Sequence, residues 1–352
     1  MLAKTSPDSK MFLAAVYKAM RDIYQSMGDQ GNTAKYLSEV MRTLQSTNQE
    51  VEDSIFDDLS LETKSLLEKF PGLRPTLKQA ATTVKMLEFW RNAKDLNAAA
   101  LLVWTDLALP RRTLSKPELK LFAHFLADIR TAEQFHSYIR FMETSYNDVI
   151  SNKVTFRCLA TFGELCVCLA DCSALMCQQL VTAGMVAVLC EWLENFQEQY
   201  AQDKSRSTLV TYAIHTIHNC CKVPDVRAVL KGQTIIYLLA PYLKMEATST
   251  RLVALLATSY LSDDDETPQV DTDTMDYIID ILGKALQEDS RSFEGYSALE
   301  LVMGIGTLCG NAANRAAFLE RSAAALVEKL MEGGEEEEAK VATSTICRLL
   351  AD

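Results

Sequence analysis

The chain has 352 residues, of which 48% are hydrophobic, and it contains only 13 Gly and 8 Pro. This composition predicts a folded protein with a sizeable core and excludes a disordered chain or a loop-rich all-β protein. Residues 1–260 carry a net charge of +1, whereas residues 261–352 carry −13. No segment supplies a strongly basic face, so we expect no nucleic acid and no anionic membrane as partner.

The N-terminus lacks the charged, apolar and small-residue regions of a secretory signal peptide. The longest purely apolar stretch, residues 98–104, has seven residues, whereas a transmembrane helix needs about 20. The sequence therefore predicts a soluble, cytoplasmic protein.

Apolar residues recur every three or four positions along the chain, which predicts an all-α fold. Pro71-Gly72 and a proline-bounded segment at residues 110–117 interrupt the pattern. We expect residues 1–150 to form an N-terminal helical region, either degenerate repeats or a separate bundle. Its predicted helices cover about residues 13–27, 33–44, 49–59, 61–70, 77–93, 96–109, 117–129 and 132–146.

A repeat emerges over residues 151–352. Five helices end in a similar way, and their matching positions are spaced by 51, 41, 47 and 41 residues. This spacing is typical of HEAT and armadillo arrays, whose period is about 40–47 residues. Between these helices a short helix, a break and a longer apolar helix recur, and the break needs a residue that tolerates left-handed backbone. The matching helix positions are Cys168, Asn219, Tyr260, Thr307 and Arg348, and the breaks fall at Gly184, Gly232 and Ser322.

Residues 151–352 thus resemble armadillo repeats, which implies an armadillo-like right-handed superhelical solenoid. The run from Glu294 to Arg315, with Tyr260 to Glu266, is similar to invertebrate proteins that place armadillo repeats before a C-terminal TIR domain. This chain contains no TIR domain and stops at Asp352, directly after the last predicted helix. Because a solenoid normally finishes with a polar capping helix, we expect that the full protein continues or that the sequence is truncated.

The resemblance also indicates where a partner binds. In armadillo proteins that grip extended peptides, an Asn on the third helix binds the ligand backbone, and one of the five matching positions here is Asn. This departure from the family pattern argues against importin-like or catenin-like peptide capture, whereas a groove of Tyr, Thr and Arg suits a protein surface or a small anionic ligand. Its expected binding positions are Asn219, Tyr260, Thr307, Arg348 and His215. The alternative is that these residues pack between repeats.

The ten cysteines, eight of them between Cys158 and Cys221, lie among apolar residues in helical patterns. Since disulfide-stapled domains are short and secreted, we expect reduced core cysteines. A reactive thiol is the alternative, although no neighbouring basic cluster is visible to lower a thiol pKa. The most metal-like cluster is His215, His218 and Cys221 with Cys220, but all of it lies on one predicted helix, so we predict no metal and no cofactor.

An acidic loop is predicted between two repeats, and it lacks the ordered frame and turn glycine of a calcium loop. We interpret it as a solvated connection, with recruitment of a basic partner as the alternative. It comprises Asp263, Asp264, Asp265 and Glu266, followed by Asp271, Asp273 and Asp276. A second acidic run, residues 335–338, opens the final predicted helix and complements its N-terminal dipole.

No nucleotide-binding, hydrolase, metalloprotease or kinase motif is present, so we do not expect an enzyme. The expected function is that of a protein-binding scaffold or regulatory module, and the resemblance places it in innate-immune or cell-death signalling. Its partner would be a TIR-containing protein or a second copy of the chain. The alternative function is a trafficking or assembly adaptor that binds a basic protein through its groove and acidic loop.

Overall fold

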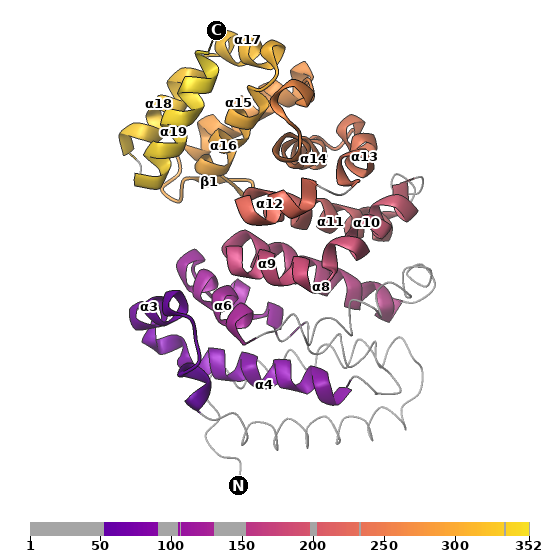
Figure 1. Cartoon of the computed structure of the whole chain (residues 1–352), viewed down its shortest axis with the longest axis vertical. Helices are drawn as coiled ribbons and strands as arrows, with labels where there is room; N and C mark the ends of the chain where they lie inside the picture. The colour runs from indigo at the N-terminus through magenta and orange to yellow at the C-terminus, as the bar shows by residue number, and fades with distance from the viewer. Residues whose placement is uncertain are drawn as a thin grey trace. The chain divides into compact units, whose positions relative to one another are not determined.

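The computed structural model describes residues 53–90, 105, 107–129, 153–197, 203–231, 234–333 and 336–351 (Figure 1). Packing divides the chain into two compact units, unit 1 (Met1–Cys220) and unit 2 (Cys221–Asp352). This division falls inside helix α11 (Lys204–Lys222). The domain boundary predicted near residue 150 lies outside the described residues.

The described part of unit 1 is helical. Ser60 caps the N-terminus of the helix that starts at Leu61, because its side chain accepts a hydrogen bond from the backbone N–H of Thr63. The ψ of 157° at Ser60 is not helical, so this helix does not continue back into the preceding residues. The helix predicted over residues 49–59 is therefore, within the described residues, only a 3-10 turn. The elements are η1 (Asp53–Phe56), α3 (Leu61–Lys69), η2 (Pro71–Leu73), α4 (Arg74–Trp90), η3 (Pro110–Arg112), α6 (Lys116–Asp128), α8 (Lys153–Cys172), α9 (Ala174–Thr182), α10 (Met185–Phe196) and α11.

Unit 2 is also helical apart from one short hairpin, so the predicted helical class is confirmed for the described residues. Its elements are α12 (Pro224–Lys231), α13 (Ile235–Leu239), η6 (Ala240–Lys244), α14 (Thr248–Leu261), η7 (Asp264–Glu266), α15 (Thr272–Ala285), β1 (Ser292–Phe293), β2 (Tyr296–Ser297), α16 (Ala298–Leu308), α17 (Ala312–Glu320), α18 (Ala323–Gly333) and α19 (Glu336–Leu349).

A three-part pattern recurs along these elements: a short helix, then two longer segments. It is visible in α9–α10–α11, in α12 with α13–η6 and α14, in η7–α15–α16, and in α17–α18–α19. Two predicted breaks are confirmed, because Gly184 has φ 83° and Ser322 has φ 59°. The third, Gly232, lies outside the described residues. We refer to α8, α11, α14, α16 and α19 as the third helices, since they carry the five matching positions of the predicted repeat.

Within unit 2, the third helix α16 packs against both α14 and α19. Glycines make this close approach possible. A Cβ placed on Gly304 would lie 2.5 Å from Cδ2 of Leu256 on α14, and one on Gly306 would lie 2.7 Å from Oγ1 of Thr345 on α19. Two glycines inside one helix weaken it, and here they allow neighbouring backbones to come together. The third helices of unit 2 are therefore joined directly, side by side.

The hairpin β1–β2 is the one departure from helical structure among the described residues, and no alternating pattern predicted it. It is antiparallel, with Phe293 paired to Tyr296, and Glu294 and Gly295 at its turn have positive φ. The ring of Tyr296 is buried, and its hydroxyl donates to the carbonyl of Ser249 at 3.3 Å. The hairpin thereby anchors the connection between α15 and α16 to the start of α14.

No single helix in the described ranges is both long enough and apolar enough to cross a membrane; only α9 and α10 taken together, with a 76° bend between them, reach the required length and hydropathy. The cysteines are free thiols, and most of them are buried. This agrees with the prediction of reduced core cysteines. The exceptions are Cys347, which is exposed, and Cys168, Cys172 and Cys190, which are half-buried.

Candidate functional site

The predicted binding positions lie near the C-terminal ends of third helices, and the structure shows what each one contacts. Asn219 on α11 is buried, and its side-chain amide donates to the carbonyl of Val167 on α8 at 3.1 Å. On the same pair of helices, a Cβ on Gly163 would lie 3.0 Å from the ring of Tyr212. Asn219 therefore joins two third helices of unit 1, as the packing alternative predicts.

Tyr260, the matching position on α14, is also buried, and α14 is enclosed from Leu252 to Leu261. The guanidinium of Arg227, from α12, lies 5.0 Å from the centre of the Tyr260 ring. Burial, with the nearby carboxylate of Glu300, raises the pKa of the Tyr260 phenol well above its usual range. This phenol stays neutral at physiological pH, and its ring is covered by a cation from the same unit.

Thr307 and Arg348 are more accessible, and both contact neighbouring helices. The Thr307 hydroxyl donates to the carbonyl of Gly304 and lies 2.9 Å from the hydroxyl of Ser259 on α14. Arg348 on α19 donates through Nη1 to the carbonyl of Gly306 on α16 at 2.8 Å. These contacts fasten α14 to α16 and α16 to α19, next to the glycines that let the helices approach.

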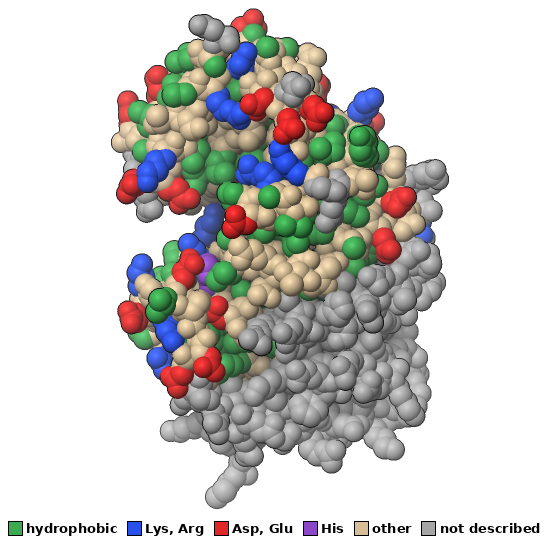
Figure 2. Space-filling model, in the orientation of Figure 1, with side chains coloured by type: hydrophobic (Ala, Val, Ile, Leu, Met, Phe, Trp, Pro, Cys, Tyr) green, Lys and Arg blue, Asp and Glu red, His purple; other side chains and the backbone are tan. Residues whose placement is uncertain are grey.

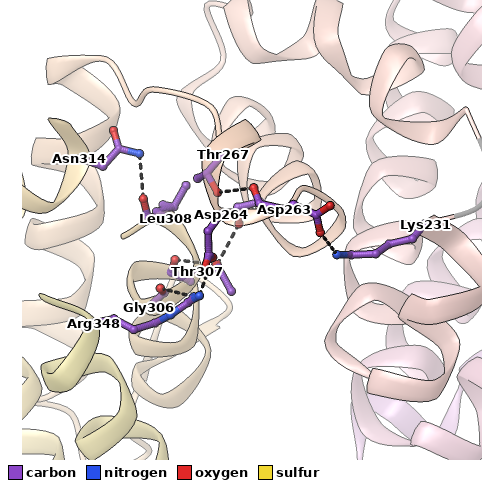
Figure 3. A network of polar contacts seen from close by, with 11 residues as sticks. Lys231, Asp263, Asp264, Thr267, Gly306, Thr307, Leu308, Asn314 and Arg348 are labelled. Atoms are coloured by element: carbon purple, nitrogen blue, oxygen red, sulfur yellow. Dashed lines mark hydrogen bonds and ion pairs between the residues drawn. The ribbon is translucent and has the colours of Figure 1, made fainter. Parts of the chain in front are cut away.

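The acidic loop is an internal crosslink rather than a purely solvated connection. Figure 3 shows Lys231 and Arg348 reaching it from opposite sides. Nζ of Lys231 lies 2.9 Å from Oδ1 of Asp263, and Nη2 of Arg348 lies 2.5 Å from Oδ1 of Asp264. Both carboxylates remain mostly exposed, so each ion pair is weak by itself. Together they link α12 and α19 to the segment between α14 and α15.

The remaining acidic residues of this segment have different surroundings. Glu266 and Asp273 are exposed, and the side chain of Asp265 lies outside the described residues. Asp271 caps α15, accepting from the backbone N–H of Thr274 at 2.9 Å. Although partial burial opposes it, hydrogen bonds from Thr274 and the charge of Arg251 lower the pKa of Asp271. Charge in this segment is therefore partly structural. On the face in Figure 2, acidic and basic side chains are interspersed rather than gathered by sign.

His215 and His218 lie one turn apart on α11, where His215 is half-buried and His218 is buried. Nowhere in the described ranges do three or more His, Cys, Asp or Glu side chains gather in a way that could hold a metal ion. Residues 216–220 are buried in the interior of unit 1. Together with His215 they do not form the set of clustered ligands that a structural zinc needs.

Sequence reasoning missed several residues that shape this surface. Gly310 is one: a Cβ there would lie 2.9 Å from the carbonyl of Asp264 and 2.7 Å from the hydroxyl of Thr267. Asn314 is another; it is buried, accepts from the N–H of Val270 and donates to the carbonyl of Leu308. Gly310 has a signal in the sequence, because a glycine within a helical pattern indicates a packing reason for its place. Lys231 carries no such signal.

No family model matches the sequence, and the comparison with curated proteins finds no match. The chemistry of the surface thus has to be read from its own residues. On α16 the accessible side chains include Met303 and Thr307, four residues apart, and on α19 they include Ser344 and Arg348, also four apart. Because residues four apart share a helix face, each pair lies on one face of its own helix, and we call these four residues together the third-helix face of unit 2.

Proposed function

We propose that this protein is a non-enzymatic, armadillo-like scaffold that binds other proteins through the third-helix face of unit 2. The observation that carries the proposal is the direct stacking of α14, α16 and α19 through Gly304 and Gly306. Stacked repeats of this kind present a continuous row of helices, which is the usual partner surface of solenoid proteins.

The chemistry of this face supports a protein partner. It combines an apolar side chain, Met303, with hydroxyls on Thr307 and Ser344 and with the Arg348–Asp264 ion pair. Methionine adapts to irregular apolar surfaces, and arginine is enriched at protein interfaces. Asn219 and Tyr260 are buried, so the proposed contact does not use them. The resemblance to armadillo–TIR proteins favours signalling in the cytoplasm, with a TIR-containing partner or self-association.

The test places a bulky charge on the face and compares it with a matched change elsewhere. Ser344 on α19 and Ala325 on α18 are both small and exposed. The wild-type protein and the variants Ser344→Arg and Ala325→Arg are each expressed in cells, and the proteins that become crosslinked to each of them are identified and quantified. We expect one or more wild-type partners to be lost with Ser344→Arg and kept with Ala325→Arg. Identical partner sets for all three proteins would overturn the proposal.

The adaptor function is the second candidate, and one observation favours it. Glu266 and Asp273 are exposed beside the ion-paired Asp263 and Asp264. An adaptor that recruits a basic protein would use these two carboxylates, because the paired ones already hold Lys231 and Arg348. The adaptor function predicts that the double variant Glu266→Gln, Asp273→Asn loses partner binding. It also predicts that partner binding by the wild-type protein declines steeply as salt is raised. Retained binding favours the third-helix face.

A further inference from the structure

The connection between η3 and α6 in unit 1 is short and lies at the surface. Thr113 and residues 115–117 are exposed, and Leu114 between them is half-buried. The backbone N–H groups of Thr113 and Leu114 both donate to the carbonyl of Pro110, at 3.0 and 2.9 Å. Exposed backbone bonds with few buried contacts open at a low cost in free energy. Another protein can therefore draw this segment out of its turn without uncovering a fully buried side chain.

Ser115 presents an exposed hydroxyl at the end of this connection. Its backbone is extended, with φ −66° and ψ 162°. The Ser115 hydroxyl donates to Oε2 of Glu118 at 2.6 Å, and the Ser115 backbone N–H donates to the same oxygen at 2.8 Å. One carboxylate on the first turn of α6 thus holds both groups of Ser115, and nothing buried holds them.

The amino-acid sequence marks the same serine. Arg112 stands three residues before Ser115, and Ser115 is the only serine or threonine in the sequence with an arginine at that position. Many serine/threonine kinases select substrates by their charge pattern, and an arginine three residues before the acceptor is one such pattern. Thr113, exposed in the same segment, has Pro110 at that position instead. Exposure and sequence therefore single out one hydroxyl.

We propose that Ser115 is a phosphorylation site for an arginine-directed serine/threonine kinase, and that its hydrogen bond to Glu118 slows the modification. The neighbouring Arg111 forms an ion pair with Glu164 on α8, so the kinase reads Arg112. The site belongs to unit 1 and does not depend on the third-helix face of unit 2.

The reaction transfers the γ-phosphoryl group of ATP to Oγ of Ser115. A bond forms between Oγ and phosphorus, and the bond from phosphorus to the bridging oxygen of ADP breaks. The hydroxyl proton passes to the catalytic aspartate of the kinase and then to water. In the unmodified protein that proton is donated to Glu118. The Ser115 hydroxyl therefore has to leave Glu118 before it can react.

The phosphate also changes the start of α6. It adds a charge of about −1.5 to −2 on an oxygen that lies 2.6 Å from Oε2 of Glu118. Because like charges repel, the Glu118 carboxylate has to move away. The phosphate then occupies the N-terminal end of α6, where the helix dipole favours an anion. Modification thus exchanges one anion for another at this helix end, and we expect the helix content to stay the same.

The experiment incubates the folded full-length chain with calmodulin-dependent protein kinase, calcium, calmodulin and ATP, and it maps phosphate by mass spectrometry. We expect phosphate at Ser115 and an unchanged circular dichroism spectrum. Ser115→Ala should abolish this phosphorylation, whereas the matched variant Thr113→Ala should keep it. Absence of phosphate at Ser115 in the folded chain, or loss of helix content when it is present, would overturn the proposal.

Three further variants test the assigned roles through the initial rate of phosphorylation. Arg112→Gln is expected to lower the rate several-fold, whereas Arg111→Gln, the matched control, should change it little. Equal losses in these two variants would exclude recognition through Arg112. Glu118→Ala frees the Ser115 hydroxyl and should raise the rate, and a rate equal to that of the wild type would contradict the role of Glu118.

Discussion

The contacts that hold neighbouring third helices together within unit 1 differ in chemistry from those within unit 2. In unit 1, α8 and α11 meet through the Gly163–Tyr212 approach and the Asn219 amide, in a region rich in thiols. In unit 2, α14, α16 and α19 meet through hydroxyl contacts and the Arg348–Gly306 bond. Neutral contacts respond little to salt, whereas exposed ion pairs are screened by it. The same kind of helix joint thus depends on a buried neutral amide in one unit and includes a charged side chain in the other.

The two units can be observed separately. All three tryptophans precede residue 221, and Trp192 is fully buried in unit 1. Tryptophan fluorescence therefore follows unit 1, whereas circular dichroism follows helices of both units. This separation matters because a chain with two units need not unfold in one transition.

The largest effect is expected from Gly304→Ala. Its Cβ would lie 2.5 Å from Cδ2 of Leu256, and the Leu256 side chain is buried. Overpacking of this kind costs about 1–3 kcal/mol of the free energy of unfolding. Urea unfolding by circular dichroism should show the loss in unit 2, while the tryptophan signal of unit 1 is unchanged.

Gly283→Ala is the matched control for that variant. Gly283 lies inside α15, and nothing is within 4 Å of an added Cβ. Here alanine should stabilise unit 2 by about 0.5–1 kcal/mol, because it only restricts the unfolded chain and favours the helix. A Gly304→Ala protein as stable as Gly283→Ala would mean that α14 and α16 do not approach through this glycine.

A smaller loss is expected from Asn219→Ala in unit 1. The variant removes a buried amide and leaves the carbonyl of Val167 without that donor. Losing one buried hydrogen bond costs about 1–2 kcal/mol, and the loss should not change with salt. Tryptophan fluorescence during urea unfolding, at low and high salt, measures it. A loss that disappears at high salt would show that charge rather than the amide holds α11 to α8.

The smallest effect is expected from Asp271→Ala, which removes the cap of α15. Caps of this type contribute about 0.5–2 kcal/mol. Because folding lowers the pKa of Asp271 below its ordinary value of 3.8, the contribution of its charge is fully present above that pH. It is lost as the pH falls through the lower folded-state value. Stability of the variant and the wild type, compared at pH 7 and pH 3, should differ less at the acidic pH.

Much of the helical architecture was predictable because it depends on local rules. Similar helix-end patterns indicated the third helices of unit 2, and the need for left-handed backbone located the breaks at Gly184 and Ser322. The hairpin at residues 292–297 was not predicted, because two-residue strands leave no alternating pattern. The predicted binding positions were placed correctly at helix ends, but periodicity could not tell which of them are buried. Asn219 and Tyr260 are buried, whereas Arg348 is partly exposed.

The amino-acid order alone predicts the helical class that the described residues show, and it contains the concentration of acid in the last quarter, since helix periodicity depends on neighbours a few residues apart. Only the tertiary structure shows that Asp263 and Asp264 hold Lys231 and Arg348, and that Arg111 forms an ion pair with Glu164 on α8. Those partners are separated by 32, 84 and 53 residues along the chain. No local pattern encodes such pairs, because packing between helices decides which distant charges meet.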